Sequence, residues 1–435
     1  MKIAVFVDKF PVRSQTFVIN QVLGLLQLGA DVTVLALASE TQHSKAELDA
    51  IHPNLSQRTV FLLSEISSPY AKLVSRVLSL VSGLLRVKTR KRVTTALQKK
   101  FGHQAKSLLL AAIASKFSTP LSFDVILCHF GQNGVVANKL REIGVLEGKV
   151  TTIFHGFDIS AKSALAKHQL DYKALFAQTE LMLPISDKWK NKLITLGCKQ
   201  EKITVHRMGI DLGLFEFAYQ PKLKPKPEAS LTQPQLLDLE AQPFNNKCLT
   251  LFTVARFSEK KGLEYAIRAL THLPEEVNCH YFIGGFGELE QSLKQLVIEL
   301  NLTNKVTFLG PLTSIEVKNH MQTADVFIQP SITADNGDME GVPVAIMEAM
   351  AVGVPVISTF HSGIPELITH NEHGLLAKER DTRALADNIS CLYRDDGNLA
   401  TKFRQNARLR IEAIADVDKL NQGLLELLTA LVNKR

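Results

Sequence analysis

The stretch Asp325–Glu366, which reads DVFIQPSITADNGDMEGVPVAIMEAMAVGVPVISTFHSGIPE, decides the fold. It begins with a short apolar run, crosses a polar loop, enters a helix rich in alanine and methionine, and ends in a second apolar run. Pro343 stands at the expected first position of the helix, where a missing N–H costs nothing. Gly353 ends the helix and Pro355 begins the next strand. This order of strand, helix and strand predicts one unit of a parallel α/β sheet.

The same alternation of short apolar runs and helical patterns extends over both halves of the chain. The runs are nearly all apolar, which is typical of strands covered by helices on both faces. We expect a first helix at Thr16–Leu28, closed by Gly29. The predicted strands are Lys2–Asp8, Asp31–Leu37, Asp124–Cys128, Thr151–Phe154, Leu181–Ile185, Leu249–Ala255, His280–Ile283, Lys305–Leu309, Asp325–Gln329 and Pro355–Ser358. The pattern predicts an α/β protein with two Rossmann-like parallel-sheet domains.

The length of the chain indicates its domain organisation. For 435 residues, two domains of about 200 residues each are expected. The polar segment Gln220–Lys247 contains five prolines and is expected to be a linker or an exposed excursion. We place the first domain at residues 1–205, the second at 206–412 and a final helix at 413–435. That helix needs an apolar surface to cover, because its leucines form one stripe: Leu420, Leu424, Leu427, Leu428 and Leu431.

Composition narrows the classes of protein that this chain can belong to. Hydrophobic residues make up 46% and charged residues 21%, which is typical of a globular rather than a disordered chain. The formal net charge of +7 suits a partner that carries phosphate. The five cysteines lie far apart in the sequence, which argues against a disulfide framework and a structural zinc site. Asp335 and Asp338 lack a third ligand, so we expect no metal.

The N-terminal segment MKIAVFVDKF has an apolar run that is too short for a secretory signal. Nowhere does the sequence contain the uncharged apolar stretch of about 20 residues that a membrane-spanning helix requires. We therefore expect a cytoplasmic protein, either free or peripheral on the inner face of the cytoplasmic membrane.

Residues 66–123 form a basic insert in the first domain, with eleven Lys and Arg residues and no Asp or Glu. Apolar residues recur in it at helical spacing: Tyr70, Leu73, Val74, Val77, Leu78, Val81, Leu84 and Leu85. A cationic amphipathic helix of this kind can lie on an anionic membrane surface. Alternatively, the stripe packs on the first domain and the charges form a solvated face. We expect no nucleic-acid partner, because the segment lacks interleaved aromatic residues for base stacking.

Two constellations in the second half carry groups suited to a phosphorylated ligand. A helix N-terminus that follows a parallel strand is a ready seat for a diphosphate. Glu340 precedes the helix and Glu348 lies inside it, where carboxylates are best suited to accept hydrogen bonds from sugar and ribose hydroxyls. Upstream, the stretch TVARFSEKKGLEYAIRAL carries Arg256 and Lys261 in a loop that opens a helix at Gly262. Two cations in such a loop can neutralise a diphosphate leaving group.

Two further candidates lie in the first half. HGFD at His155–Asp158 directly follows a predicted strand, and strand-end loops often hold functional residues. A structural histidine is the alternative interpretation. Ser14 and Thr16 stand just before the first helix, where they could contact an acceptor or a donor phosphate, or could cap that helix.

Together these motifs resemble the retaining GT-B glycosyltransferases of family 4. The matching features are A-R-F-x-x-K-K-G, the pair Glu340 and Glu348, E-A-M-A-x-G-x-P-V-I and S-G-I-P-E. The segment FPVRSQTFV near the start, with the long stretch quoted first, resembles the exopolysaccharide enzymes related to the colanic-acid glycosyltransferases. The resemblance spans both halves and is dense in the second. It implies the GT-B architecture, in which two Rossmann-like domains face each other across a cleft.

The resemblance also implies roles for individual residues. Arg256 and Lys261 would hold the donor diphosphate, Glu340 would contact the transferred sugar and Glu348 would bind the ribose of the nucleotide. His155 would approach the reacting sugar. The other implied donor-binding residues are Gly284, Gly285, Gly287, Ser331, Gly341 and Val342, and the acceptor-binding residues are Ser14, Thr16 and Asp158. The final helix would return to the first domain.

The implied activity is transfer of a hexose-type sugar from a nucleotide-diphosphate sugar to a glycan or lipid-linked acceptor. It would retain the anomeric configuration, need no metal or other cofactor, and belong to exopolysaccharide or cell-surface polysaccharide biosynthesis. Two alternatives stay open: a GT-B sugar-nucleotide epimerase and a catalytically silent, membrane-associated assembly protein. A Rossmann oxidoreductase is not expected, because no G-x-G-x-x-G follows the first strand and IGGFGELE lacks the third glycine.

Overall fold

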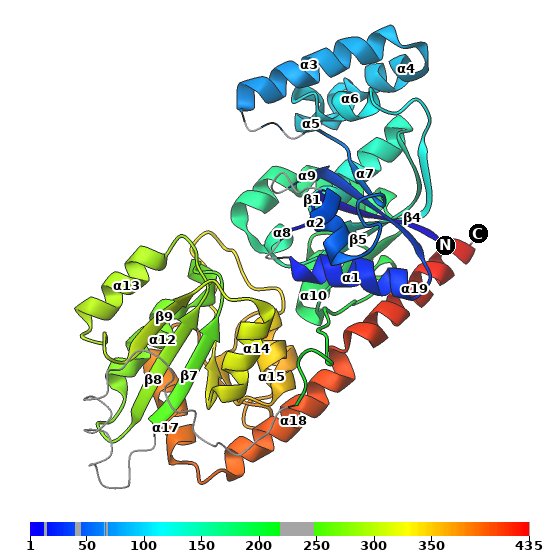
Figure 1. Cartoon of the computed structure of the whole chain (residues 1–435). Helices are drawn as coiled ribbons and strands as arrows, with labels where there is room; N and C mark the ends of the chain where they lie inside the picture. The colour runs from blue at the N-terminus through cyan, green and yellow to red at the C-terminus, as the bar shows by residue number, and fades with distance from the viewer. Residues whose placement is uncertain (13–14, 40–44, 65, 67, 218–247, 435) are drawn as a thin grey trace. The chain divides into compact units, whose positions relative to one another are not determined.

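The computed structural model describes residues 1–12, 15–39, 45–64, 66, 68–217 and 248–434. The chain divides into two compact units. Unit 1 comprises Met1–Gly209, Asn336–Val342 and Val417–Arg435, and unit 2 comprises Ile210–Asp335 and Pro343–Asp416. Each unit is built on a six-stranded parallel sheet flanked by helices (Figure 1). The predicted fold class, an α/β protein with two parallel-sheet domains, is confirmed. The predicted linker at Gln220–Lys247 lies outside the described residues.

The sheet of unit 1 has the strand order β3-β2-β1-β4-β5-β6, and every neighbouring pair is parallel. Its strands are β1 (Lys2–Lys9), β2 (Asp31–Ala38), β3 (Thr59–Phe61), β4 (Leu121–His129), β5 (Leu146–Phe154) and β6 (Leu181–Pro184). All five strands predicted in this half are present. The sequence did not predict β3, which has only three residues and lies at the edge of the sheet.

Strand β1 shows how the sheet separates two cores. Alternate side chains of a strand point to opposite faces. Accordingly, Ile3, Val5 and Val7 are buried in one cluster, which also contains residues of the helices α1 (Thr16–Gln27), α10 (Asp187–Thr195) and α19 (Val417–Asn433). Ala4 and Phe6 are buried in the other cluster, with residues of α4 (Val87–Ala96), α6 (Leu109–Ala114) and α7 (Gly131–Ile143). Both faces of the sheet are therefore covered, as its continuously apolar strands require.

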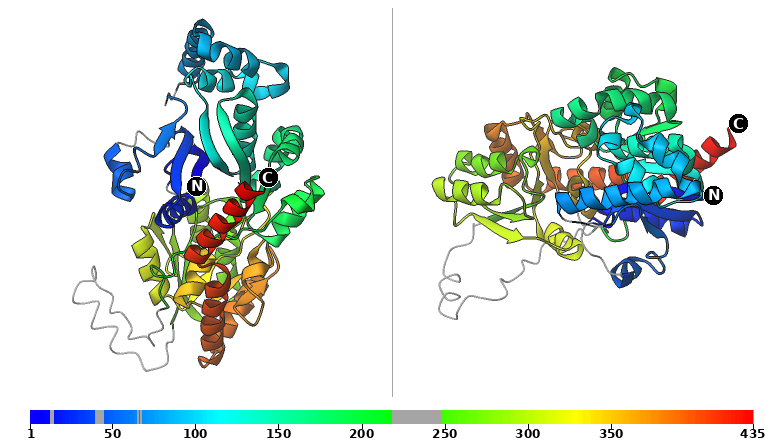
Figure 2. Two further views of the ribbon diagram at one scale, coloured as in Figure 1. Left: turned by 90° about the vertical axis from the view of Figure 1, so that its right-hand side faces the viewer. Right: turned by 90° about the horizontal axis from the view of Figure 1, so that it is seen from above.

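The helices of unit 1 include the last helix of the chain. They are α1 (Thr16–Gln27), α2 (Lys45–Ile51), α3 (Pro69–Leu85), α4 (Val87–Ala96), α5 (His103–Lys106), α6 (Leu109–Ala114), α7 (Gly131–Ile143), α8 (Phe157–Ser160), α9 (Lys162–Gln178), α10 (Asp187–Thr195) and α19 (Val417–Asn433). Leu424 and Leu428 of α19 are buried in the core that contains Val18 and Val22 of α1. Figure 2 shows α1 in blue and α19 in red side by side.

The C-terminal end of α19 is held by Lys149 of β5. The Lys149 ammonium donates hydrogen bonds to the carbonyl oxygens of Leu431 and Lys434, each at 2.7 Å. A cation at this position satisfies carbonyls that have no partner within the helix and interacts favourably with the negative end of the helix dipole. The stripe of leucines in the last helix thus covers unit 1.

The sheet of unit 2 has the order β12-β11-β10-β7-β8-β9 and is also parallel throughout. Its strands are β7 (Cys248–Val254), β8 (Asn278–Gly284), β9 (Val306–Gly310), β10 (Val326–Ile328), β11 (Val356–Thr359) and β12 (Leu375–Ala377). The helices are α12 (Leu263–Ala269), α13 (Glu290–Glu299), α14 (Ser314–Thr323), α15 (Val344–Val352), α16 (Ile364–Leu367), α17 (Thr382–Arg394) and α18 (Asn398–Ile414). The sequence missed only the three-residue edge strand β12 among these strands.

Helix α15 is the helix of the stretch that decides the fold. Pro343 is its N-cap residue, one position earlier than predicted, and the Pro343 carbonyl oxygen accepts the first helical hydrogen bond from the Met347 N–H. The prediction that Pro343 is the first helical residue was therefore wrong by one position, because the helix begins at Val344. Gly353 is the C-cap with φ 89°, a left-handed conformation that favours glycine.

The strand order of each sheet defines one position at which a ligand can bind. In an open parallel α/β sheet, ligands bind beyond the carboxyl ends of the strands, where the strand order reverses. In unit 1 this reversal lies between β1 and β4, and in unit 2 between β7 and β10. The loops after these strands are therefore where functional side chains are expected.

The basic insert forms the helices α3 to α6. One interpretation of its apolar stripe is wrong, namely that the stripe packs on the first domain. Seven of its eight residues are exposed, and Leu84 alone is half-buried. Within the described part of the chain, no helix combines the length and the apolar character needed to span a membrane.

Candidate active site

The loop after β7 in unit 2 carries Arg256 and Lys261. The Arg256 side chain is 71% exposed, and its guanidinium lies 3.3 Å from a carboxylate oxygen of Glu288, which follows β8. The loop ends in a short 3-10 turn, Glu259–Lys261, and Gly262 then caps α12. Two cations and the start of a helix thus follow the central strand of the sheet. This arrangement can bind an anion, because backbone N–H groups and positive side chains are close in sequence and belong to the same edge.

This loop packs tightly on the loop that follows β10. The Ile332 N–H donates to the Lys260 carbonyl oxygen at 2.9 Å. A Cβ atom on Gly262 would lie 1.9 Å from the Pro330 carbonyl oxygen, and Gly262 has φ 66°, so a glycine is required there. The loops on both sides of the reversal in unit 2 therefore touch each other.

Three glycines that the family resemblance assigned to donor binding have a packing role. A Cβ on Gly285 would lie 1.9 Å from the Ala255 carbonyl oxygen, and one on Gly287 would lie 2.5 Å from that of Phe257. A Cβ on Gly284 would lie 2.5 Å from a side-chain carbon of Leu312. Gly285 and Gly287 let the loop after β8 approach the Arg256 loop closely, whereas Gly284 leaves room for the Leu312 side chain. Their contact with a nucleoside stays a prediction.

Glu348 lies on α15, four residues after the first helical residue. The side chain is half-buried, and burial raises the pKa of its carboxyl group to about 7. A carboxyl group in such a place gains from a ligand that donates hydrogen bonds to it, because those bonds favour the charged form. This behaviour suits a ribose with its pair of hydroxyl groups.

Ser331 was predicted to bind the donor, but its side chain is completely buried. Its hydroxyl accepts a hydrogen bond from the Gln329 amide at 3.1 Å, and its carbonyl oxygen accepts one from the Thr359 hydroxyl. The Ser358 hydroxyl donates to the Gln329 carbonyl oxygen at 2.6 Å. This network joins the ends of β10 and β11. Ser331 therefore helps to hold this loop, and its predicted contact with the donor stays a prediction.

In unit 1, His155 and Asp158 lie in the turn after β5. Asp158 is fully buried, and its carboxylate accepts hydrogen bonds from the N–H groups of Gly131 at 2.8 Å, Gly156 at 3.0 Å and His155 at 3.1 Å. Burial raises the pKa of Asp158 to about 6, against the lowering effect of these bonds. Asp158 therefore fixes the backbone of His155. Its predicted contact with an acceptor stays a prediction.

His155 forms a pair with His129, the last residue of β4. The rings are stacked with centroids 5.2 Å apart, and His129 Nδ1 lies 3.1 Å from His155 Nε2. Phe17 and Phe130 pack around His155, with ring centroids 4.6 and 4.5 Å away. Burial lowers the pKa of His129 to about 3 and holds the pKa of His155 well below 6.5. Both rings are therefore neutral at physiological pH.

The histidine pair borders a cavity in unit 1. Gln21 of α1, His206 and Asn421 of α19 also line it. The Gln21 amide nitrogen lies 3.2 Å from His206 Nε2, and burial lowers the pKa of His206 to about 4. Among the residues that line the cavity, four buried side-chain atoms have no hydrogen-bond partner in the described part of the chain: Gln21 Oε1, His129 Nε2, His155 Nδ1 and Asn421 Nδ2. Buried polar groups are nearly always hydrogen-bonded, so these atoms point to a polar ligand or to water.

The tautomers of the pair define what this cavity can bind. A neutral imidazole has one donor and one acceptor nitrogen. Since one nitrogen of His129 and one of His155 are used in their mutual hydrogen bond, the pair presents one remaining donor and one remaining acceptor in either tautomeric arrangement. A hydroxyl group has the same two functions. The cavity is therefore chemically suited to the hydroxyl of a sugar.

Glu340, Gly341 and Val342 belong to the segment Asn336–Val342, which packs with unit 1. Glu340 is buried, with 6% of its surface exposed. A Cβ on Gly341 would lie 2.2 Å from the His155 carbonyl oxygen, so glycine is needed where the two backbones meet. The structure therefore brings Glu340 next to the His155 turn, whereas Arg256, Lys261 and Glu348 belong to unit 2.

The remaining predictions concern the acceptor side and metals. Ser14 lies outside the described residues. Thr16 is exposed at the first position of α1, and the N-cap residue of this helix is Gln15, so Thr16 does not cap it. Within the described ranges, no group of three or more His, Cys, Asp or Glu side chains could hold a metal ion. None of the five cysteines, all of which are described, forms a disulfide. The metal-free reaction stays a prediction.

Sequence reasoning missed four residues of the cavity: Gln21, His129, His206 and Asn421. A signal for His129 existed, because it directly follows the predicted strand Asp124–Cys128 just as His155 follows Thr151–Phe154. For Asn421 no local signal existed, because its place depends on the packing of α19 against α1.

Comparison with known proteins identifies the family. The model of the family "Glycosyl transferases group 1" matches residues 237–410. The putative colanic acid biosynthesis glycosyltransferase WcaL of Escherichia coli K12 is 40% identical over 433 residues, which are 99% of this chain and 100% of that protein. The chain belongs to the group 1 glycosyltransferases. The amylovoran biosynthesis glycosyltransferase AmsK of Erwinia amylovora is 42% identical over 389 residues, 89% of each chain.

The solved structures of other glycosyltransferases support the fold. HepE from Anabaena, solved with UDP, matches with a TM-score of 0.67 at 19% identity and covers 99% of this chain and 100% of its own. WaaG, a glycosyltransferase involved in lipopolysaccharide biosynthesis, matches with a TM-score of 0.60 at 16% identity, covering 98% and 99% of the two chains. This group 1 glycosyltransferase thus has the GT-B fold, and the predicted resemblance to the GT-B glycosyltransferases of exopolysaccharide biosynthesis is confirmed, while retention of the anomeric configuration stays a prediction.

Proposed function

We propose that this glycosyltransferase moves a hexose-type sugar from a nucleotide-diphosphate sugar to a glycan or lipid-linked acceptor in the biosynthesis of an exopolysaccharide or cell-surface polysaccharide. We also propose that it retains the anomeric configuration and works in the cytoplasm, at the inner face of the cytoplasmic membrane. The names of the relatives, which refer to colanic acid and amylovoran biosynthesis, support the pathway class. HepE, which shares the fold, has been solved with UDP-glucose, which supports the donor class.

One observation carries the proposal: in unit 2, a loop with two cations and the loop that leads to α15 meet at the reversal of the sheet. Cleavage of a sugar–diphosphate bond develops negative charge on the leaving phosphate and positive charge on the anomeric carbon. Arg256, Lys261 and the first N–H groups of α15 are the groups that would stabilise this leaving group. Such fixed donors usually make the largest contribution to catalysis. The reaction then requires no metal ion.

The polar cavity of unit 1 supplies a different contribution. In the proposed reaction, His155 and His129 bind a sugar hydroxyl through one donor and one acceptor nitrogen, as neutral groups. Asp158 holds the His155 turn, so its effect on the sugar is indirect. Glu340, packed beside the same turn, would accept a hydrogen bond from the transferred sugar. Retention would then follow from attack on the same face from which the diphosphate leaves.

A donor panel tests this function. The full-length enzyme is mixed with UDP-, GDP- and dTDP-sugars, and its melting temperature is measured. Donors that stabilise it are then supplied in radiolabelled form with membrane lipid extract as acceptor. We expect label in the lipid or polymer fraction and an α-configured product from an α-configured donor, measured by NMR. Conversion of the donor without any acceptor would identify an epimerase instead. Absence of transfer and of slow hydrolysis with every donor would contradict the proposal.

A further inference from the structure

Helix α3 presents its apolar side to solvent. Its residues Tyr70, Leu78 and Leu85 are 77%, 65% and 74% exposed, and Val87, just beyond its end, is 85% exposed. The other exposed members of the same stripe are Leu73, Val74, Val77 and Val81. Single exposed apolar residues are common on protein surfaces, but a continuous apolar face on one helix marks an interaction site.

The opposite side of α3 is the side that packs against the protein. A Cβ on Gly83 would lie 2.7 Å from the Ser115 Cβ and 2.8 Å from a methyl carbon of Val93, so α3 lies very close to α4 and the end of α6. Arg76 donates a hydrogen bond to the Ser107 carbonyl oxygen at 2.8 Å. Leu80 packs against the core cluster from the margin of the apolar side. The orientation of the helix is therefore fixed by the side that carries Arg76, Leu80, Gly83 and Leu84, and the rest of the apolar face is left uncovered.

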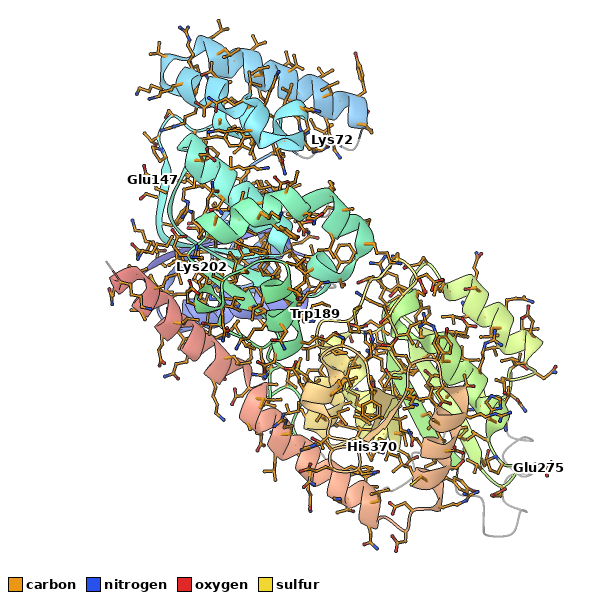
Figure 3. The ribbon with its side chains drawn as sticks, turned by 180° about the vertical axis from the view of Figure 1, so that it is seen from behind. Lys72, Glu147, Trp189, Lys202, Glu275 and His370 are labelled. Carbon is orange, nitrogen blue, oxygen red and sulfur yellow. The ribbon has the colours of Figure 1, made fainter. Side chains whose placement is uncertain are left out.

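The insert that carries the apolar face supplies positive charge and no acidic side chain. Residues 66–123 contain no Asp or Glu. The exposed cations on α3, α4 and the junction between them are Lys72, Arg86, Lys88, Arg90 and Lys91. Figure 3 shows the side chains that project from α3, with Lys72 labelled. Charge and apolar surface thus occur together on one part of unit 1.

We propose that α3 lies in the surface of an anionic lipid bilayer, with its apolar face among the acyl chains and its cations at the headgroups. A helix with this pattern binds the membrane interface through apolar burial and attraction to anionic lipids together. A second copy of the chain fits this face less well, because the cations of both copies would approach each other. Nucleic acid fits less well too, because Tyr70 is the only aromatic side chain among the exposed apolar residues of the face.

The biological role of this membrane contact rests on the proposed function, because a lipid-linked acceptor would be located at the membrane surface. The surface itself can be tested without a donor or an acceptor. Vesicle binding and sugar transfer are therefore separate measurements, and the failure of one is distinguishable from the failure of the other.

The experiment is flotation of the full-length protein with vesicles at low salt. The vesicles contain either phosphatidylcholine alone or phosphatidylcholine with about one third phosphatidylglycerol. We expect binding to the anionic vesicles and about tenfold weaker binding to the neutral ones. The double variant Leu73→Ser/Leu78→Ser should lower binding to the anionic vesicles about tenfold or more, and Lys88→Gln/Arg90→Gln should lower it severalfold. High salt should release part of the bound protein.

Leu170→Ser is the matched control, because Leu170 is 82% exposed on α9, outside this face, and its loss should leave vesicle binding unchanged. Circular dichroism and the melting temperature verify that each variant is folded. Recovery of the wild-type protein entirely in the unbound fraction at low salt would overturn the proposal. So would a concentration-dependent dimer that Leu73→Ser/Leu78→Ser dissociates, without vesicle binding, because the face would then join two copies of the chain. Equal loss of binding in Leu170→Ser would overturn it as well.

Discussion

The carboxyl edges of the two sheets have the same topology and opposite chemistry. In unit 2, the reversal of strand order is followed by Arg256, Lys261 and a helix start, and the Arg256 guanidinium is largely exposed. In unit 1, the equivalent edge carries His129 and His155, which are neutral because burial lowers the pKa of each ring. One edge can therefore stabilise negative charge, whereas the other can exchange hydrogen bonds with uncharged groups.

This difference suits the two edges to different chemical groups. Charge-assisted hydrogen bonds are stronger than neutral ones and suit a diphosphate. Neutral donors and acceptors distinguish hydroxyl positions without competing for the anion. A parallel sheet places a ligand at its reversal in both cases, so the side chains at each edge decide what is bound.

The largest effect is expected at the charged edge. Arg256→Ala or Lys261→Ala should lower kcat about a hundredfold, as for the loss of one donor to a developing oxyanion. Lys260→Ala is the matched control, because it removes another cation of the same loop and keeps the Lys260 carbonyl oxygen, which accepts a hydrogen bond from the Ile332 N–H. Steady-state kinetics with the preferred donor measures the effect. Near-normal turnover in both of the first two variants would refute the assignment of the charged edge.

The next effect concerns the helix that completes the neutral edge. A Cβ on Gly24 of α1 would lie 2.0 Å from Asn421 Nδ2, so Gly24→Ala should displace α19 and lower the free energy of unfolding by about 1–3 kcal/mol. Gly423→Ala on α19 is the control, because nothing lies within 4 Å of its added Cβ. That substitution should raise stability by up to about 1 kcal/mol through helix propensity. Urea denaturation measures the free energy of unfolding of the two variants. Equal changes in this free energy for Gly24→Ala and Gly423→Ala would show that α1 and α19 do not pack as described.

A smaller effect is expected from the histidine pair. His129→Phe removes one hydrogen bond to the proposed hydroxyl and should lower kcat/KM about tenfold, while His129→Gln, which keeps one donor and one acceptor, should restore part of it. Because the pair is neutral in the folded protein, its contribution should not change between pH 6.5 and 8. The measurement is kcat/KM of the wild-type protein and of the two folded variants across this pH range. A loss of activity in His129→Phe that varies strongly over this range would indicate that the pair carries charge.

The smallest effect is a pH dependence at Glu348. Its pKa is raised from 4.5 to about 7 by burial, so the folded protein keeps this proton where the unfolded chain has lost it. Stability from this group is therefore present below pH 4.5 and is lost as the pH rises through about 7. A ribose that donates to the carboxylate should bind severalfold more tightly at pH 8 than at pH 6. Calorimetry measures the affinity for the nucleotide at both pH values, and Glu348→Gln should remove the pH dependence of this affinity. An unchanged pH dependence in that variant would exclude Glu348 as its source.

The sequence predicted much of the fold because long apolar strands and helix caps are local features. The ten predicted strands are present, while β3 and β12 were missed because each has three residues and lies at a sheet edge. The charged candidates could be found because cations in a loop after a strand have few structural uses. Asp158 shows the limit of this reasoning: its position after a strand suggested a ligand contact, but three backbone N–H groups occupy its carboxylate.

The neutral cavity could not be predicted, because its members come from separate parts of the chain. Gln21 and Asn421 are 400 residues apart in the sequence and meet only because α19 packs on α1. The sequence also could not predict whether the apolar stripe of α3 faces the protein or the solvent. Helical spacing shows that a helix has an apolar side, but which side the protein covers depends on contacts such as that of Gly83 with Ser115.

The assembly of unit 1 from three separate pieces of chain has a consequence for chimeric enzymes. A chimera that replaces only residues 1–209 would keep the original α19, whose Leu424 and Leu428 are buried in the core of the part being exchanged. A truncated fragment that ends at Gly209 would leave that core open to water. An exchange of unit 1 between relatives should therefore include Val417–Arg435 as well as the first 209 residues.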